Sequence, residues 1–366
     1  MAEIPTFVPI SVESQQHKPA EHFDLLSPFE FLEDFKIEAT GAKQRIWVQV
    51  MEYQHGEIVG AFHKELLNGA QRGLHVHLAV DWYNRLTHNG HFNSLALPFK
   101  KNELYIAKQQ DNHFVDELRD AGAYVIHVNR PANFIDEKVP VRGRNHTKIV
   151  IVDNIAYVGG MNLTDSNFRS FDFMVKISDP EMVQALSEQI FRVNDNRRTQ
   201  DYSRTFSDGE TSMMVDCGTK GESGILDEAL EMINTEQEQA IYVSQLIPDG
   251  DIRTSLRRAR ERGVKVEGIT SEITNHPVVF RELNLASLAT MIVKGETFPI
   301  KQYPSTLHAK LLWTPKGVYF GSHNLNQSGV EAGTEEVGFF SKNEKLIKNF
   351  RAVCETLTQR SRPLFD

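Results

Sequence analysis

Two stretches of this sequence carry the same polar residues at the same spacing. In the first, RNHTKIVIVDNIAYVGGMN, His146 and Lys148 are two residues apart, and Asn162 follows sixteen residues after the histidine. The second stretch repeats these offsets with His308, Lys310 and Asn324. Side chains alternate between the faces of a β-strand, so each histidine should project to the same side as its lysine.

If the two stretches meet, two imidazoles, two ammonium groups and two amides would surround one tetrahedral anion. Such a set suits a phosphodiester, whose nonbridging oxygens would accept charge-assisted hydrogen bonds from the lysines and the asparagines. One neutral histidine could attack phosphorus and form a phosphohistidine, while the other, protonated, gives a proton to the leaving alkoxide. No carboxylate cluster for Mg²⁺ stands beside the motifs, so we expect no metal and no cofactor.

Each motif should open a hairpin that returns to the same end of its sheet. An apolar run follows each lysine, then a turn, and then a second apolar run that ends in a glycine-containing segment. The first segment ends in Gly159-Gly160-Met161-Asn162 and the second in Gly321-Ser322-His323-Asn324. We therefore expect Gly160 and Ser322 to join the two asparagines in binding a phosphate.

These motifs resemble those of the phospholipase D superfamily, whose mark is a duplicated H-x-K-x4-D motif followed by G-[GS]-x-N. The resemblance runs from about Lys43 to the C-terminus, and the details favour the cardiolipin synthase branch. It implies an α/β protein of two similar α/β/α halves with mixed central sheets, packed about a pseudo-two-fold axis. It also implies His146 as the nucleophile and His308 as the acid/base.

The resemblance further implies an acidic residue downstream of each asparagine that orients a histidine. The matching positions are Asp172 and Glu336, with Glu335 as an alternative to Glu336. The second motif has Pro315 where the family pattern has the aspartate that the first motif supplies as Asp153. If that aspartate only shapes the turn, its loss is nearly neutral; if it supports the histidine electrostatically, the second half is weakened.

The elements around the motifs also indicate an internal duplication. A predicted strand at Arg45–Tyr53, helix at Val59–Ala70 and strand at Leu74–Val80 form one β-α-β unit, and residues 239–269 repeat it. We divide the chain into an arm of residues 1–40, a first half of residues 41–195, a linker of residues 196–210 and a second half of residues 211–366. The first half has about 28 extra residues before its motif, which we place within Trp82–Asp116 as a lid or a surface loop.

Composition limits the class of protein. The 366 residues are 40% hydrophobic and 24% charged, as in a globular protein, and a net charge of −9 disfavours nonspecific nucleic-acid binding. Cys217 and Cys354 lack the spacing of a disulfide framework or a zinc site. We see no membrane-spanning run or leader, so we expect a cytoplasmic protein with peripheral contact at the inner membrane face.

Three hypotheses follow for the function. The first is an enzyme that transfers a phosphatidyl group, or hydrolyses a phospholipid, through a phosphohistidine; an anionic glycerophospholipid is the expected substrate. The second is a metal-independent nuclease of the same superfamily. The third is a binding protein whose second site has degenerated, suggested by Pro315.

Overall fold

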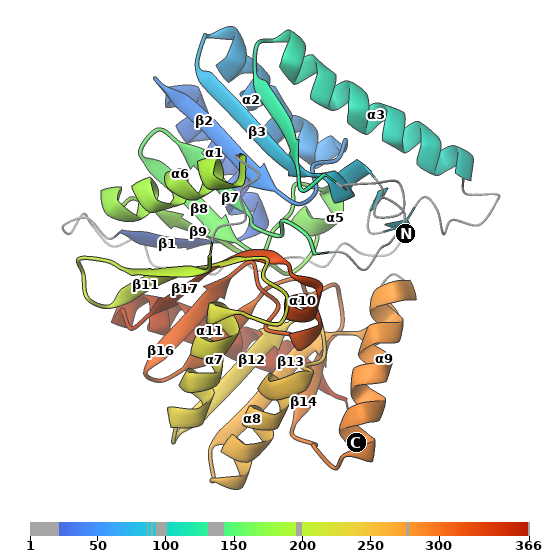
Figure 1. Ribbon diagram of the computed structural model, residues 1–366, viewed down its shortest axis with the longest axis vertical. Helices are drawn as coiled ribbons and strands as arrows, with labels where there is room; N and C mark the ends of the chain where they lie inside the picture. Colours follow the sequence, from blue (N-terminus) through green and yellow to red (C-terminus); the bar gives the residue numbers. More distant parts are fainter. Residues whose placement is uncertain are drawn as a thin grey trace.

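The computed structural model describes residues 22–85, 87–88, 91–92, 101–130, 143–194, 200–275 and 278–364 of the chain. Two large mixed sheets form the centre of the molecule, one in each half, and helices cover both faces of each sheet (Figure 1). This architecture confirms the α/β fold of two similar halves. Within the described residues, no helix combines the length and the apolar character needed to cross a lipid bilayer.

The first sheet has seven strands in the order β1-β9-β8-β7-β2-β3-β6. Their bounds are β1 Phe23–Leu26, β2 Arg45–Val50, β3 His75–Asp81, β6 Tyr124–Val128, β7 Ile149–Val152, β8 Ile155–Gly159 and β9 Met174–Ile177. Strands β2, β3 and β6 are parallel to one another, whereas β7 pairs antiparallel with β2. The residues before β7 therefore lie at the carboxyl end of β2.

The second sheet repeats this order and adds one strand at each edge: β10-β11-β17-β16-β15-β12-β13-β14-β18. Its strands are β10 Tyr202–Thr205, β11 Thr211–Cys217, β12 Gln239–Ser244, β13 Lys265–Ser271, β14 Ile300–Tyr303, β15 Leu311–Thr314, β16 Gly317–Gly321, β17 Glu335–Ser341 and β18 Arg362–Pro363. Each inner strand has one counterpart in the first sheet, so the topology is that of a duplication.

The helices form three layers around the two sheets. The outer layer of the first half has α1 Pro28–Gly41, α2 Glu57–Gln71 and α3 Lys101–Asp120, and that of the second half has α7 Gly224–Thr235, α8 Gly250–Glu261 and α9 Val278–Val293. Helices α6 Pro180–Asn194 and α11 Glu344–Arg360 lie between the sheets, and short α5 Asp165–Phe168 and α10 Gln327–Ala332 follow the hairpins.

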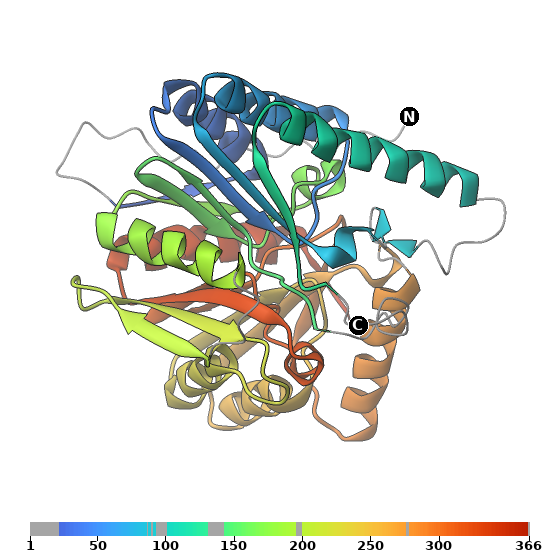
Figure 2. The same ribbon diagram turned by 45° about the horizontal axis from the view of Figure 1, so that its top comes forward.

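One continuous apolar core joins the two halves. Side chains of α6 and α11 pack in it together with inward residues of both sheets, such as Ile151 of β7 and Leu311 of β15. The rings of Phe173 and Phe350 are 5.1 Å apart, edge to face, so α11 of the second half contacts the first half directly. This shared core fixes the halves relative to each other (Figure 2).

The first half begins earlier in the structure than our division placed it. β1 pairs antiparallel with β9. Ser27 is the N-cap residue of α1, and its hydroxyl and the Glu30 side chain form a capping box. Residues 23–40, assigned to an arm, therefore supply an edge strand and a helix. In the same way, β10 of the assigned linker pairs with β11. Short edge strands with few apolar residues carry little periodic signal in the sequence.

The placement of the 28 extra residues within Trp82–Asp116 is wrong for half of them. From Gly73 to the start of β6 there are 51 residues, against 37 from Gly263 to the start of β14, a difference of 14. The other 14 lie between the start of β6 and His146, mainly in residues 131–142, outside the described residues. The described part of Trp82–Asp116 includes a short hairpin, β4 Thr87–His88 with β5 His91–Phe92, and most of α3. Its role as a lid remains a prediction.

The motif aspartate of the first half shapes the fold and lies away from the histidines. At the far end of the hairpin, the Asp153 carboxylate accepts hydrogen bonds from the backbone N–H groups of Lys43, Gln44 and Arg45, at 2.7 to 2.9 Å. In the second half, the buried Glu236 accepts from the N–H groups of Gln237 and Glu238 at 2.8 and 2.7 Å. Glu236 thus accepts the backbone hydrogen bonds that the missing aspartate would have accepted. The second half therefore keeps this part of the fold with Pro315 in the motif.

We expect Asp153→Ala to lower the free energy of unfolding by about 1–2 kcal/mol, the usual cost of losing a capping carboxylate. Partial burial raises the pKa of Asp153, but the three backbone donors outweigh it and the net pKa is lowered. A carboxyl whose folded pKa is depressed stabilises the fold above its unfolded pKa of about 3.9 and loses that contribution as the pH falls further. Urea unfolding should show a smaller difference from wild type at pH 3 than at pH 7.

The matched control is Pro315→Asp, which restores the family residue in the second half. Since Glu236 already accepts hydrogen bonds from the adjacent N–H groups, we expect a free energy of unfolding close to that of wild type and turnover within about two-fold of it. A large gain in turnover would show that the aspartate acts on the histidine after all.

Candidate active site at the interface of the two halves

The two motifs meet at the interface between the halves. His146 precedes β7 and His308 precedes β15, so both lie where the parallel strands of their sheets end, the usual position of sites in α/β sheets. The backbone N–H of His146 donates to the carbonyl of Glu335 at 2.8 Å, and that of His308 donates to the carbonyl of Phe171 at 2.9 Å. The strand before each histidine is therefore paired with the other half.

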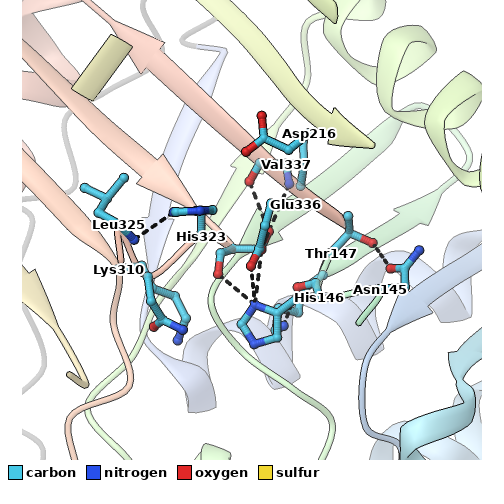
Figure 3. Close-up of polar contacts among 12 residues, drawn as sticks. Asn145, His146, Thr147, Asp216, Lys310, His323, Leu325, Glu336 and Val337 are labelled. Atoms are coloured by element: carbon cyan, nitrogen blue, oxygen red, sulfur yellow. Dashed lines mark hydrogen bonds and ion pairs between the residues drawn. The ribbon is translucent and has the colours of Figure 1, made fainter. Parts of the chain in front are cut away.

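Each histidine is held by a carboxylate from the other half. His146 Nδ1 lies 3.0 Å from Oε1 and 3.1 Å from Oε2 of Glu336, and 3.0 Å from the carbonyl oxygen of Ser322 (Figure 3). His308 Nδ1 lies 2.8 Å from Oδ2 of Asp172. A carboxylate that accepts from Nδ1 fixes the tautomer and leaves Nε2 available for chemistry. Both positions picked from the sequence thus contact a ring.

Glu335, the alternative to Glu336, has a different task. Its carboxylate accepts from the Asn145 side chain at 2.7 Å, and its backbone N–H donates to the Arg144 carbonyl at 2.7 Å. It pairs the strand before His146 with β17 and does not contact the ring. The choice between the two acids is therefore settled in favour of Glu336.

Burial controls the charge of the two imidazoles. Burial lowers the pKa of His146 to about 4, with Glu336 opposing and Lys148 adding to the shift. Burial and then Lys310 lower the pKa of His308 to about 3, against Asp172. Although burial alone would raise the pKa of Glu336, the His146 ring outweighs it and lowers that pKa to about 2. Without a ligand, both rings are neutral at pH 7 beside ionised Glu336.

The two lysines are fully buried and lie beside the rings. Each Nζ donates to the backbone carbonyl of its own motif histidine, and Lys310 Nζ is also 3.1 Å from His308 Nδ1. Burial lowers the pKa of Lys148 to about 7 and that of Lys310 to about 8. A phosphodiester would supply the negative charge that favours the ammonium forms.

The asparagines and their neighbours complete the wall of the site. The amide oxygens of Asn162 and Asn324 are buried, and neither has a hydrogen-bond partner among the described residues. Turning the Asn324 amide by half a rotation would offer its NH₂ to an anion, whereas the NH₂ of Asn162 is donated to Glu52. A Cβ on Gly160 would lie 2.8 Å from Lys310 Cδ and 3.0 Å from Asp172 Oδ1, so only glycine fits there.

Ser322 contacts the orienting acid directly. Its hydroxyl donates to Glu336 Oε2 and accepts from the Val337 backbone N–H at 2.9 Å. We assigned Ser322 to phosphate binding, and in the structure its hydroxyl holds Glu336 in place. A role in binding phosphate remains a prediction for the backbone of this segment.

Glu52 is a site residue that our sequence reasoning missed. It directly follows the carboxyl end of β2, is buried, and accepts from Asn162 Nδ2 at 3.3 Å. Its charge raises the pKa of Lys148, so it contributes to the field at the lysine. An acidic residue just after a parallel strand is the signal that could have identified it.

His323, which precedes Asn324, is buried. Its Nδ1 accepts from the Leu325 backbone N–H at 2.8 Å, and the Leu325 backbone has a φ of 51°. Such a left-handed conformation is unfavourable for leucine and needs support. Tyr242 and Ser244 donate to the Asn324 carbonyl at 3.1 and 3.2 Å, so this segment is held from both sides.

The lysine pKa values predict how substrate binding depends on pH. A lysine of pKa about 7 or 8 loses its charge as the pH rises past that value, and a neutral amine no longer attracts a phosphodiester. We expect KM for an anionic phosphodiester to rise by about ten-fold for each pH unit above pH 8. The rise should end at the higher pKa that the lysines have when substrate is bound. Lys148→Met should have a raised KM at pH 7 and a flatter pH profile. A KM independent of pH between 7 and 10 would contradict this prediction.

Among the described residues, no group of three or more histidine, cysteine, aspartate or glutamate side chains is arranged to hold a metal ion. The geometry thus defines a class: a two-half α/β protein with a paired histidine, lysine and carboxylate centre for a tetrahedral anion.

Comparison with known proteins gives the family. The model of the cardiolipin synthase, PLD-like domain matches residues 36–193 and 229–358, which is most of the chain and leaves the segment between the halves unmatched. The chain belongs to this phospholipase D-like family, and the resemblance seen in the motifs is confirmed.

Individual relatives are distant. Cardiolipin synthase B of Shigella flexneri and of Escherichia coli K12 are each 22% identical over 314 residues, which cover 80% of this chain and 70% of theirs. The crystal structure of phosphatidylserine synthase from Haemophilus influenzae Rd KW20 superposes with a TM-score of 0.69 at 16% identity and covers 94% of this chain and 88% of that one.

The polyphosphate kinase of Porphyromonas gingivalis shares the fold too, with a TM-score of 0.58 at 13% identity over 92% of this chain and 50% of that one. Proteins with different names thus share this architecture. The fold alone does not choose the substrate.

Proposed function

We propose that this protein transfers the phosphatidyl group of an anionic glycerophospholipid to an alcohol or to water through a phosphohistidine. The observation that carries the proposal is the exchange of carboxylates, in which Asp172 holds His308 at 2.8 Å and Glu336 holds His146 at 3.0 Å. Two oriented imidazoles beside two buried lysines suit a double displacement at phosphorus.

In the proposed first step, neutral His146 attacks phosphorus through Nε2, and the bond to the leaving alkoxide breaks. His308, charged when the bound anion raises its pKa, gives its proton to that oxygen. In the second step, neutral His308 takes a proton from an alcohol or water, whose oxygen attacks phosphorus and releases His146. The order of these roles follows the resemblance of the first motif to its family.

The lysines and asparagines bind the nonbridging oxygens in both steps. Since the lysines are buried, each charge–oxygen contact is stronger than in water and needs little reorganisation. The choice of a phospholipid is supported by membership in the cardiolipin synthase domain family, by the similarity to cardiolipin synthase B, and by the net charge of −9, which is unfavourable to nucleic-acid binding.

The test is to incubate the purified protein with ³²P-labelled phosphatidylglycerol, with and without added glycerol, and to separate the lipid products. We expect cardiolipin from transfer to a second phosphatidylglycerol, or phosphatidate from hydrolysis. His146→Ala is the inactive control. If neither product forms while a labelled oligonucleotide is cut in EDTA, the nuclease hypothesis replaces this one; tight binding of the lipid with no product from either substrate supports the binding protein.

A further inference from the structure

Helix α9 has an apolar surface that faces solvent. From Leu283 to Val293 it has no charged residue. The exposed residues of this stretch are all apolar: Leu283, Leu285, Ala286, Ala289, Ile292 and Val293. The side chains of Val293, Ile292 and Leu283 are exposed to 86%, 54% and 44%. A helix that is apolar on all sides is normally buried, so this surface needs an explanation.

A single stripe of residues attaches α9 to the second half. Asn284 accepts from the Ile247 backbone N–H at 2.7 Å, and Met291 and Leu288 pack on the outer core of that half. These positions fall on one helical face because they are four and three residues apart. The exposed apolar residues lie on the remaining circumference.

The exposed face of α9 leads toward the candidate active site. A cavity of about 220 Å³ is lined by Leu283 and Ala286 of the helix, by Leu246 and Ile247 after β12, and by Asn326. Asn326 is two residues from Asn324 of the site. The cavity therefore lies between α9 and the segment that carries Asn324, and polar residues also line it, among them Asp249, Arg253 and Ser287.

The first half has a related feature in an equivalent place. Helix α3 connects β3 to β6 as α9 connects β13 to β14, and it exposes Tyr105 and Ile106 to 65% and 58%. In both ribbon views the start of α3 and the whole of α9 lie on the same side of the molecule (Figures 1 and 2). The two helices that carry these exposed apolar residues therefore lie on one side of the molecule.

We propose that α9, together with the start of α3, docks the protein on the surface of a phospholipid bilayer. The inference rests on the proposed function, because a diacyl substrate stays in the bilayer and must enter the site from it. An apolar helix face can sink into the boundary of headgroups and acyl chains without any partner side chains. The start of α3, which belongs to the Trp82–Asp116 segment, is then the smaller part of the docking surface.

The size of the surface favours a bilayer over a second protein. Eleven helical residues span about 16 Å, and a helix is about 10 Å wide, so the face offers roughly 160 Å². A stable protein interface needs about 800 Å² on each partner, with a polar rim. Along the helix itself, charged residues flank this face at its ends, Arg281 and Glu282 before it and Lys294 after it.

The test measures flotation of the full chain with vesicles of phosphatidylglycerol and phosphatidylcholine in equal parts. The docking variant is Ile292→Asp with Val293→Asp, and the matched control is Ile37→Asp on α1, where Ile37 is 71% exposed. We expect wild type and control to float and the docking variant to lose at least about ten-fold in partition, since two exposed apolar contacts become charges. Tyr105→Asp should give a smaller loss.

Three results would overturn the proposal: wild type that does not float, a docking variant that floats like wild type, or wild type that sediments as a dimer while the docking variant is a monomer. The last result would assign the face to a second copy of the chain. Turnover of a short-chain, water-soluble phosphatidylglycerol separates this proposal from the proposed function. If α9 docks the protein and no lipid is turned over, only the proposed function fails; if the short-chain lipid is turned over and docking does not depend on α9, only this inference fails.

Discussion

Replacing His308 by alanine is expected to leave phosphate on His146. With the proton donor and acceptor gone, attack by His146 on a substrate with a good leaving group can still proceed, but no base activates the alcohol or water that resolves the intermediate. We expect turnover to fall by at least about 10⁴-fold and a labelled protein to accumulate. The P–N bond of phosphohistidine hydrolyses in acid, so the measurement is a rapid quench followed by peptide mass spectrometry under neutral conditions.

His146→Ala should lose as much turnover and carry no phosphate at all. His113→Ala is the control, because the His113 side chain is 77% exposed on α3 and should be dispensable. Phosphate on His308 in the His146→Ala protein would show that the two rings have the opposite roles. No phosphate on either ring in any variant, with turnover intact in wild type, would rule out the covalent intermediate.

Neutralising the two orienting carboxylates should separate the two chemical steps. Asp172 contacts His308 and Glu336 contacts His146, so Asp172→Asn should slow the proton transfers and Glu336→Gln should slow the attack on phosphorus. An amide in place of the acid can hold the wrong tautomer of the ring, and we expect a loss of about 10³-fold in kcat for each. Phosphohistidine should accumulate with Asp172→Asn only.

Glu335→Gln is the matched control for this series, since Glu335 is next to Glu336 in sequence and contacts Asn145 instead of the ring. We expect a loss of about ten-fold or less. The double variant of Asp172 and Glu336 should lose less than the product of the single losses, because the rings act as one unit. Equal accumulation of phosphohistidine in both single variants would contradict the assignment of one carboxylate to each step.

Much of the fold could be predicted from the sequence because its central elements are periodic. The predicted helix at Val59–Ala70 lies within α2, and the predicted strand at Arg45–Tyr53 contains β2. Elements without a sustained pattern were missed. β1 has only four residues, too few for a periodic pattern, and β10 alternates exposed and half-buried residues like a polar loop; pairing with β9 and β11 makes them strands.

The residues of the candidate site could be predicted from the sequence, but the contacts between them could not. Matched spacing identified the histidines, lysines and asparagines, since both motifs lie in a local hairpin. That Asp172 serves His308 and Glu336 serves His146 depends on packing between residues more than 100 positions apart, which no local pattern encodes. The position of Glu52 after β2 was a local signal that we did not use, and its approach to Lys148 becomes visible only once β2 and β7 have paired.

The exchange of carboxylates has a consequence for the origin of the chain. A single half has a histidine without the acid that orients it, and an acid without its histidine. An ancestor with one half would have been competent only as a symmetric pair, each molecule completing the other, before fusion placed both on one polypeptide. After that fusion the two copies were free to diverge, as the aspartate at position 153 and the proline at position 315 show.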